Sequence, residues 1–315
     1  MLIKGYRDSF EYLDMIGARD QVAAYPGGVF EMREGPLHWQ VPARGFLKAI
    51  MTGAVPGVGL FNLKGKTAYR RVWEPLVLAI FNARPDQVSG KLLWQTFREV
   101  LKQGAEALIP YFARTTLHDA FVGPALKQLD IKTNMRLLTV SNDRLSFKDH
   151  QIELDENNKA ILALPQHAYA QVENPFQIKV METAPITNIH FYLDHPVRNQ
   201  FFGLVNTLSQ WVYANDNLIS VTISNFKPQG DDLAERVWRE LCFHFDKAEA
   251  QMPPFKVICE KTATPLQDKN FVENRLKTET QFPNLRLAGD WIDTALPATI
   301  ESAIRSGKVA AQTIF

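Results

Sequence analysis

The last 32 residues, NLRLAGDWIDTALPATIESAIRSGKVAAQTIF (284–315), carry the most informative pattern of the chain. The short apolar run 285–288 predicts a strand, which ends in Gly289-Asp290. A loop follows, and a helix is expected from near Pro297 to about Thr313, because proline suits a first helical turn, where its missing N–H has no intrahelical partner. Small residues recur on this helix at a spacing of four, which places them on common faces and allows a sheet or a ligand to approach closely. They form two columns: Ala298, Ser302, Ser306 and Ala310, and beside it Ala303, Gly307 and Ala311.

The Gly-Asp turn and the helix start offer groups that suit a cofactor. Gly289 permits a tight exit from the strand, and Asp290 is expected at the carboxyl end of that strand, where α/β folds place ligands. Its carboxylate can accept hydrogen bonds from sugar-type hydroxyls. The N–H groups of Ala298, Thr299 and Ile300 are expected to be unpaired, with the positive end of the helix dipole behind them. A flavin fits both features, through its ribityl hydroxyls and its N1–C2=O edge, but the same spacing also suits a strand, turn and helix that serve packing alone.

The composition is that of an ordinary globular chain of about two domains, with 315 residues, 46% apolar and 22% charged. Lys plus Arg number 35 and Asp plus Glu 34, so no basic face for nucleic acid is expected. Cys242 and Cys259 are too few for a disulfide framework or a cysteine zinc site, which favours a cytoplasmic compartment. The seven histidines show no metal-ligand spacing, so no metal site is expected. No apolar stretch reaches the about 20 residues of a spanning helix.

Periodicity gives a coarse map of the remaining chain. Helices are expected over 10–16, over 70–112 with a break at Pro85, and over 232–248. Three strands, 135–140, 145–154 and 160–164, are predicted to form an antiparallel meander. Further strands are predicted at 186–193, 218–225 and 257–259, followed by a loop that reaches to about Pro283.

The C-terminal stretch resembles the flavin signature of the FAD-dependent amine-oxidase superfamily, through LAGDW and LPATIESAIRSGKVAA. Its squalene-associated branch, the hydroxysqualene dehydroxylases, is the most similar, and phytoene desaturases and protoporphyrinogen oxidase are more distant. Further resemblances follow in the family's order: GYRDSFEYLDMIGA (5–18), RVWEPLVLAIFNARPDQVSG (71–90), PITNIHFYLD (185–194) and ATPLQDKN (263–270).

The resemblance implies an α/β fold of the FAD/NAD(P)-binding, amine-oxidase-like type, interleaved with a mixed α+β substrate domain. Residues 1–19, 117–175 and 276–315 would belong to the FAD-binding domain, and 20–116 and 176–275 to the substrate domain. By position in the family pattern, Gly289 and Asp290 would hold the ribityl-pyrophosphate part of FAD. Met135 would lie near the adenine, and Pro165, which ends Ala163-Leu164-Pro165, beside the cofactor. The helix start that would face the pyrimidine ring consists of Pro297, Ala298, Thr299 and Ile300.

The activity implied by the resemblance is a flavin-dependent redox step on a polyisoprenoid lipid. For the squalene branch, reduced FAD would deliver hydride to a carbon that loses its hydroxyl, giving squalene from hydroxysqualene on the route to hopanoids. Glu74 is a candidate for a catalytic residue, because an acid in an apolar stretch must be paired or functional; a structural hydrogen bond is the other interpretation. Asp293, with Thr294, is expected to cap the last helix. The substrate would be reached from the inner face of the membrane, and the segment 45–61 is interpreted as core or as an apolar docking segment there.

One part of the family pattern is missing from these residues. The family opens with a G-x-G-x-x-G turn that binds the FAD pyrophosphate, whereas Gly53, Gly57 and Gly59 have the wrong spacing and follow no clear strand. Three explanations stay open: a misassigned start, a separate chain that supplies the nucleotide-binding unit, or its loss. We expect this chain alone to bind FAD poorly and to expose sheet edges. Two alternative functions therefore remain, a noncatalytic remnant or subunit and an FAD oxidoreductase for amines, porphyrinogens or carotenoids.

Overall fold

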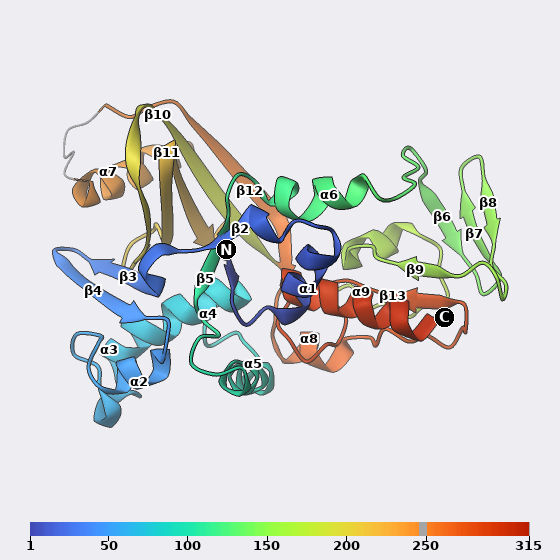
Figure 1. Ribbon diagram of the computed structural model, residues 1–315, viewed down its shortest axis with the longest axis horizontal. Helices are drawn as coiled ribbons and strands as arrows, with labels where there is room; N and C mark the ends of the chain where they lie inside the picture. Colours follow the sequence, from blue (N-terminus) through green and yellow to red (C-terminus); the bar gives the residue numbers. More distant parts are fainter. Residues whose placement is uncertain (246–250, 315) are drawn as a thin grey trace. The chain divides into compact units, whose positions relative to one another are not determined.

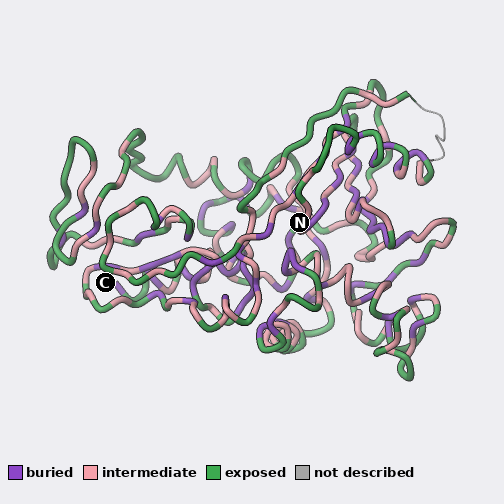
Figure 2. Tube along the Cα trace, turned by 180° about the vertical axis from the view of Figure 1, so that it is seen from behind, coloured by how far each residue is buried: buried purple, intermediate pink, exposed green. Residues whose placement is uncertain are grey.

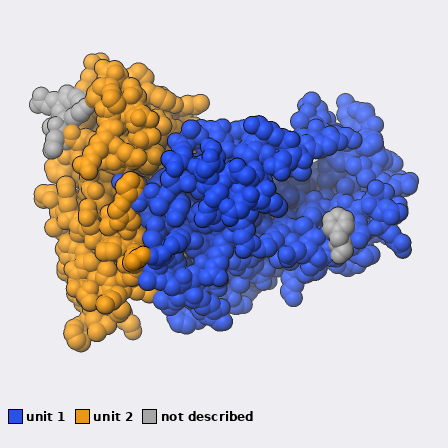
Figure 3. Space-filling model, in the orientation of Figure 1, with its two compact units in different colours: residues 1–25, 89–182, 267–315 blue, residues 26–88, 183–266 orange. Residues whose placement is uncertain are grey.

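The computed structural model describes residues 1–245 and 251–314, and the chain divides into two compact units (Figure 3). Each unit is assembled from segments that are distant in the sequence. Unit 1 consists of Met1–Tyr25, Ser89–Glu182 and Gln267–Phe315, and unit 2 of Pro26–Val88 and Thr183–Leu266.

The boundaries of these units differ from those predicted for the FAD-binding and substrate domains, most of all over residues 89–116, which lie in unit 1. The physical reason is β5 (Pro110–Ala113), which pairs on one edge with β1 (Leu2–Ile3) and on the other with β2 (Val22–Ala24). This small antiparallel sheet ties the segment to the N-terminus of the chain. The shorter segments 20–25, 176–182 and 267–275 also lie in unit 1.

Unit 2 is built on a long mixed sheet (Figure 1). Its central strand β10 (Thr183–Leu204) pairs antiparallel with β11 (Trp211–Ser224) and β12 (Phe255–Pro265). At its far end β10 pairs in parallel with β3 (Val29–Glu34), which continues into β4 (Leu37–Pro42). The strands expected at 186–193, 218–225 and 257–259 lie inside these longer strands.

Helix α7 (Leu233–His244) packs against this sheet, because its buried side chains and those of the strands form one hydrophobic cluster. Val237, Trp238 and Leu241 on one helix face join Ile189 and Phe191 of β10 in one buried cluster. The predicted helix 232–248 is confirmed up to His244, and residues 246–248 of that prediction lie outside the described residues.

A helical run in unit 2 explains how Pro75 is accommodated. It passes from α3 (Lys66–Ala68) through a π-helical turn (Tyr69–Trp73) into α4 (Glu74–Phe81). Pro75 has no N–H to donate to the preceding turn, and the wider turn lies directly before it. This run, α2 (Phe46–Met51) and the strands β3 and β4 share one core, which includes Trp39, Ile50, Val55, Val58, Ala68 and Val72.

Asn82 ends α4 and connects it to the sheet. Its backbone is left-handed, with φ +50°, and its side chain is buried. The amide nitrogen donates to the carbonyl of Ala184 at 3.1 Å and to Thr264 Oγ1 at 3.0 Å, while Oδ1 accepts from the N–H of Asn225 at 2.6 Å. One side chain therefore joins α4 to β10 and β12 and to the residue that follows β11.

Unit 1 combines helices with three small sheets. Its principal helices are α1 (Arg7–Met15), α5 (Gly90–Lys102), α6 (Gly123–Leu126), which follows a π-helical turn (His118–Val122), α8 (Lys269–Asn274) and α9 (Ile300–Ile314). Besides β1–β5–β2, its sheets are β6 (Leu137–Val140) with β7 (Arg144–Phe147) and β8 (Gln151–Glu153), and β9 (Ala160–Leu162) with β13 (Leu285–Leu287). Short 3-10 helices in the chain span Arg19–Gln21, Pro26–Gly28, Leu60–Asn62 and Gln166–Gln171.

The predicted meander is correct in part. The stretch 145–154 is not one strand, because a turn at 147–150, closed by the Phe147 N–H on the His150 carbonyl at 2.8 Å, divides it into β7 and β8. The expected third strand, β9, leaves the meander and pairs in parallel with β13. The strands of the β6–β8 sheet are exposed or half-buried except at Val140 and Leu145 (Figure 2), whereas Leu285 and Leu287 of β13 are buried.

Two other expectations need correction. The helix expected up to residue 112 ends at Lys102, and β5 follows. The expected loop before Pro283 contains α8, whose start is capped by Asp268 Oδ1, an acceptor for the N–H of Phe271 at 2.8 Å. No helix within the described residues is long and apolar enough to cross a membrane.

Candidate cofactor site

The turn that follows β13 can be made only by glycine. Gly289 has φ +143°, and a Cβ placed on it would lie 2.7 Å from Nε1 of Trp291. Trp291 is fully buried, and its indole N–H donates to the carbonyl of Leu164 at 3.0 Å. Glycine is therefore required at position 289 by the close contact with the Trp291 side chain. This contact fixes the direction in which the backbone continues from β13 to Asp290.

The two columns of small residues on α9 have different environments. Ser302, Ser306 and Ala310 are fully buried, and the Ser306 hydroxyl accepts from the Gly289 N–H at 2.8 Å. This column therefore holds α9 against the Gly-Asp turn. The second column, Ala303, Gly307 and Ala311, is partly or fully exposed, and a Cβ on Gly307 would meet no atom within 4 Å.

Asp290 carries a carboxylate in an environment that opposes its charge. Burial raises the pKa of Asp290 above its ordinary value, against the N–H groups of Asp290 and Trp291 and the positive charge of Arg275. No side-chain hydrogen bond to this carboxylate is found among the described residues. A partly buried acceptor without such a partner is open to donors from a ligand.

Arg275 organises the loop after Asp290, and sequence analysis missed it. Its guanidinium donates to the carbonyls of Leu296 at 2.8 Å, Trp291 at 3.3 Å and Ile292. Burial lowers the pKa of Arg275 to about 10, although nearby carboxylates favour its charge. A buried arginine that points at carbonyls leaves no periodic signal in a sequence, so nothing in the pattern could have identified it.

The start of α9 differs from the expectation in two ways. The helix begins at Ile300, and the Ala298 N–H, expected to be unpaired, donates to Oε1 of Gln267 at 2.8 Å. Thr299 Oγ1 faces the N–H of Ser302 at 3.4 Å, the position of an N-cap. Within residues 1–245 and 251–314, no acceptor faces the N–H groups of Thr299 and Ile300.

Asp293 and Thr294 do not cap this helix, contrary to the expectation. Asp293 Oδ1 accepts from the N–H of Ala295 at 3.2 Å and lies 4.0 Å from Nη1 of Arg275. The hydroxyl of Thr294 lies 2.6 Å from that of Ser302. Both residues therefore contribute to the loop, and Thr299 occupies the N-cap position of α9 instead.

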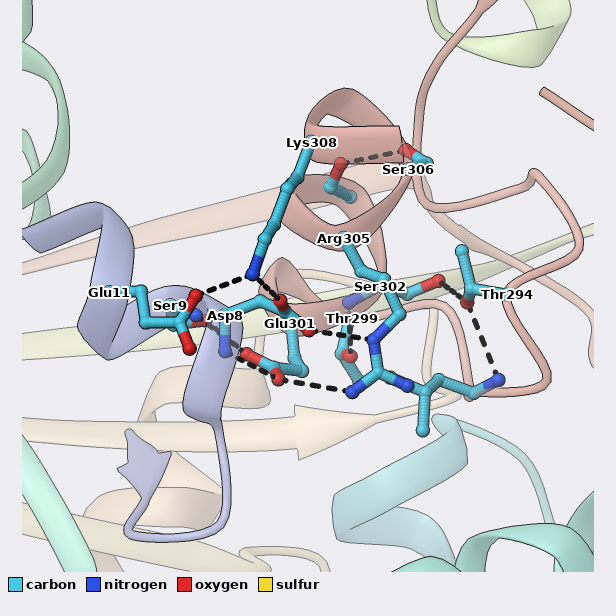
Figure 4. A network of polar contacts seen from close by, with 12 residues as sticks. Asp8, Ser9, Glu11, Thr294, Thr299, Glu301, Ser302, Arg305, Ser306 and Lys308 are labelled. Atoms are coloured by element: carbon cyan, nitrogen blue, oxygen red, sulfur yellow. Dashed lines mark hydrogen bonds and ion pairs between the residues drawn. The ribbon is translucent and has the colours of Figure 1, made fainter. Parts of the chain in front are cut away.

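Behind this helix start, α9 is fastened to α1 by a buried carboxylate (Figure 4). Glu301, 2% exposed, accepts from the N–H of Asp8 at 3.0 Å and from the N–H and hydroxyl of Ser9 at 2.8 and 2.7 Å. Burial raises the pKa of Glu301, while these donors oppose the shift. Glu301 thereby supplies acceptors for the unpaired first turn of α1.

Basic side chains complete this network on the outer side. Arg305 Nε donates to Asp8 Oδ2 at 2.7 Å, and Lys308 Nζ reaches Asp8 at 3.0 Å and Glu11 at 2.5 Å (Figure 4). Burial raises the pKa of Tyr6 to about 12, against a hydrogen bond with the Thr299 side chain, and the Glu301 charge adds to the rise. Residues of α1, together with Tyr6 directly before it, therefore hold the start of α9.

The other expected cofactor residues also lie in unit 1. The carbonyl of Leu164 receives the Trp291 indole, so the segment that ends in Pro165 reaches the Gly-Asp turn, and Pro165 itself is exposed. Pro297 lies in the loop before the helix start. Met135 is half-buried and precedes β6.

Glu74 lies in unit 2, at the start of α4, where it lines a cavity of about 530 Å³. Arg70 and Arg236 contribute cations to the wall, and Leu78 and Ile223 contribute apolar surface. Glu240, the other acid of the wall, already accepts three hydrogen bonds from residues 208–209. No partner is found for the Glu74 carboxylate among the described residues.

The groups in unit 1 have the donor and acceptor chemistry of a flavin site. The Asp290 carboxylate can accept from hydroxyls, and the N–H groups of Thr299 and Ile300 stand at the positive end of a 15-residue helix. The exposed small column of α9 leaves its surface open to a flat ring. Among the described residues, no three His, Cys, Asp or Glu side chains are placed to hold a metal ion.

Comparison with known proteins defines the class. Residues 58–315 match the family described as flavin containing amine oxidoreductase. In structure the chain is similar to putrescine oxidase, with a TM-score of 0.61 at 11% identity over 99% of this chain and 86% of the other. The chain belongs to the flavin containing amine oxidoreductase family, a family whose cofactor is a flavin, and the predicted α/β fold is confirmed.

Within this family, the chain is similar to proteins named hydroxysqualene dehydroxylase. It is 34% identical to the one from Sinorhizobium fredii over 78% of this chain and 62% of the relative. It is 27% identical to the one from Zymomonas mobilis over 99% of this chain and 84% of the relative. The chain thus spans less than two thirds of the length of the Sinorhizobium relative.

Proposed function

We propose that the protein to which this chain belongs is an FAD-dependent oxidoreductase that converts hydroxysqualene into squalene. The observation that carries the proposal is the Asp290 carboxylate beside the start of α9, on a chain that is 34% identical to a hydroxysqualene dehydroxylase. The relatives favour this substrate over amines, porphyrinogens and carotenoids.

The residues of unit 1 would bind and orient the cofactor. Asp290 would accept hydrogen bonds from the ribityl hydroxyls, and the N–H groups of Thr299 and Ile300 would donate to the pyrimidine edge of the isoalloxazine ring. Arg275 and Glu301 would hold this geometry through the loop and through α1. When bound, FAD in its reduced form supplies the hydride that replaces the substrate hydroxyl.

The hydroxyl group leaves as water, so the reaction also needs a proton. We assign this proton to Glu74, because it lines the cavity of unit 2 and, unlike Glu240, has no partner among the described residues. Glu74 would hold a proton at the oxygen of the substrate, so that the hydroxyl group would leave as water. The apolar part of the wall suits an isoprenoid chain.

A nucleotide-binding unit with a G-x-G-x-x-G turn would complete the cofactor site. The two-stranded parallel sheet β9–β13 supports this proposal, because parallel strands normally lie inside larger, covered sheets. Ile161 on β9 is 37% exposed, so this strand offers apolar surface and an edge for pairing. The low cysteine content of the sequence, two residues, supports a cytoplasmic location, and the substrate a peripheral position at the inner face of the membrane.

Flavin binding tests the cofactor site. The chain is titrated with FAD, and binding is followed by quenching of flavin fluorescence. Replacement of Asp290 by Asn should weaken binding about tenfold or more, because a charge-assisted hydrogen bond is lost. Asp149→Asn, an exposed turn residue, is the matched control and should leave binding unchanged. Equal affinities for Asp290→Asn and wild type would contradict the assignment.

Product analysis tests the reaction. Protein, FAD, dithionite as reductant and hydroxysqualene are incubated together, and squalene is measured by gas chromatography with mass spectrometry. Squalene should form only when protein and reduced FAD are both present. If the chain binds no FAD alone, the assay is repeated with the N-terminal segment of the Sinorhizobium relative added as a separate chain. Absence of squalene from a flavin-loaded protein would refute the proposed substrate.

A further inference from the structure

Two large apolar side chains are exposed to solvent on one turn of unit 2. Phe61 is 101% exposed and Leu60 58% exposed, both within the 3-10 helix Leu60–Asn62 between α2 and α3. Met51, at the end of α2, is 40% exposed. Single apolar residues on a surface are common, but a phenylalanine without any cover beside an exposed leucine is a candidate contact.

The turn is fixed by its own hydrogen bonds. Asn62 Oδ1 accepts from the N–H of Gly59 at 2.6 Å, and Asn62 Nδ2 donates to the carbonyl of Gly57 at 2.8 Å. Directly before it, Val55 and Val58 are buried in the core of unit 2. The segment 45–61 therefore has a packed base and an exposed apolar tip.

The chain segment that carries the tip, residues 35–73, has charged residues of one sign. No Asp or Glu occurs between Glu34 and Glu74, although the whole chain has nearly equal numbers of acidic and basic residues. Lys48, Lys64 and Lys66 are exposed, and none of them forms an ion pair among the described residues. The basic residues of this segment are Arg44, Lys48, Lys64, Lys66, Arg70 and Arg71, of which Arg70 and Arg71 pair with Glu34.

The apolar tip and the lysines around it together discriminate between two possible partners, a second copy of the chain and a lipid bilayer. In a symmetric dimer through the tip, the lysines of one copy would face those of the other, and like charges oppose such an interface. An anionic bilayer instead offers phosphates to the lysines and acyl chains to the tip. Lysine also fits this geometry, because its aliphatic stem can lie along apolar surface while the ammonium stays in the headgroup layer.

We propose that Leu60 and Phe61 insert into the surface of an anionic lipid bilayer and that Lys48, Lys64 and Lys66 bind its headgroups. The inference rests on the exposure and charge of this surface and does not depend on the redox reaction. Such a contact would hold unit 2 at the membrane without a spanning helix.

Vesicle co-sedimentation tests the proposal with the full chain. Wild type should bind vesicles of phosphatidylcholine with phosphatidylglycerol, should not bind phosphatidylcholine alone, and should be released by salt. Leu60→Ser with Phe61→Ser should weaken binding at least tenfold. Lys48→Glu, Lys64→Glu and Lys66→Glu together should abolish it, since each lysine contributes about fivefold.

Matched controls separate the surface from general effects. Leu129→Ser with Phe243→Ser removes an exposed leucine and an exposed phenylalanine, 60% and 56% exposed, and Lys91→Glu, Lys127→Glu and Lys148→Glu make the same change of net charge elsewhere. Both controls should bind like wild type, and all variants should keep the melting temperature, because only exposed side chains change.

Three results would overturn the proposal: no binding of wild type to anionic vesicles, equal binding by the tip variants, or equal loss in the controls. Concentration-dependent dimerisation that disappears in Leu60→Ser with Phe61→Ser would assign the surface to a second copy instead. No flavin or turnover enters this assay, so its failure leaves the proposed reaction untouched, and failure of the reaction leaves this assay valid.

Discussion

The backbone N–H of Ser9 donates to the carboxylate of Glu301 at 2.8 Å, across 292 positions of the chain. This contact joins the first turn of α1 to the first turn of α9, the helix that carries the candidate cofactor site. It satisfies N–H groups that a helix cannot pair internally, and it places negative charge at the positive end of α1. The local geometry of the C-terminal motif therefore depends on the N-terminal helix.

Removal of this carboxylate should destabilise the protein strongly. Glu301→Ala leaves two backbone donors and the Ser9 hydroxyl without their acceptor in a buried site, which should lower the free energy of unfolding by about 2–4 kcal/mol. Urea unfolding measures the change. The control Glu11→Ala removes an exposed acid that pairs with Lys308, and should cost far less. Similar losses for both variants would show that Glu301 has no special role.

Asp8 should make the free energy of unfolding depend on pH in the acid range. Burial alone would raise its pKa, but hydrogen bonds and charges of Arg305 and Lys308 outweigh this effect and hold the pKa of Asp8 below its ordinary value. Its stabilising contribution is complete above the unfolded-state pKa of about 4 and disappears as the pH falls through the lower, folded-state pKa.

The pH dependence can be isolated by subtraction. Urea unfolding of wild type and Asp8→Asn is compared from neutral to acid pH, and the difference between them should shrink as the pH falls. Glu301 acts in the opposite direction, because its pKa is raised, so its charge costs stability as the pH rises. A difference between wild type and Asp8→Asn that stays constant with pH would contradict the assigned role.

Arg275→Lys should weaken the loop between Asp290 and α9. Lysine keeps the positive charge but cannot reach several carbonyls in the plane of a guanidinium, so at least one buried carbonyl loses its donor. We expect a loss of about 1–3 kcal/mol in urea unfolding. Arg239→Lys, on the exposed face of α7, is the matched control. The loop assignment would be wrong if the two substitutions had equal effects.

Two Gly→Ala substitutions should have opposite signs. In Gly289→Ala the new methyl group meets Trp291 and the backbone is left-handed, so a loss of at least about 2 kcal/mol is expected. In Gly307→Ala the methyl group enters open space on α9, where alanine favours the helix by about 1 kcal/mol. Thermal unfolding distinguishes the two. Destabilisation by both would mean that the exposed column of α9 is covered.

Glu74→Gln tests the proposed proton donor. If Glu74 protonates the leaving hydroxyl, kcat of the flavin-loaded protein should fall at least about a hundredfold, because general acid catalysis contributes this much or more. KM and flavin affinity should stay near the wild-type values. Glu235→Gln, an exposed acid on α7, should retain full activity. A Glu74→Gln enzyme with normal kcat would assign Glu74 to structure.

The sequence alone determined the strand, the Gly-Asp turn, the C-terminal helix and the family. These features are local or periodic: Gly289 needs its φ angle, and the small residues of α9 recur every four positions. Because such signals lie within a few residues of one another, they can be read without the fold. The same reasoning predicted helix α7.

Only the tertiary structure decided which of these groups remain available to bind a cofactor. Ala298 loses its expected role because its N–H donates to Gln267, which is distant in sequence. Arg275 and Glu301 act through backbone carbonyls and N–H groups, which leave no pattern of side chains in the sequence. Strand pairing is likewise non-local, so β9 pairs with β13 instead of its neighbours in the chain. Hydrogen-bond partners far apart in sequence are set by packing, which is why the fold was needed to find them.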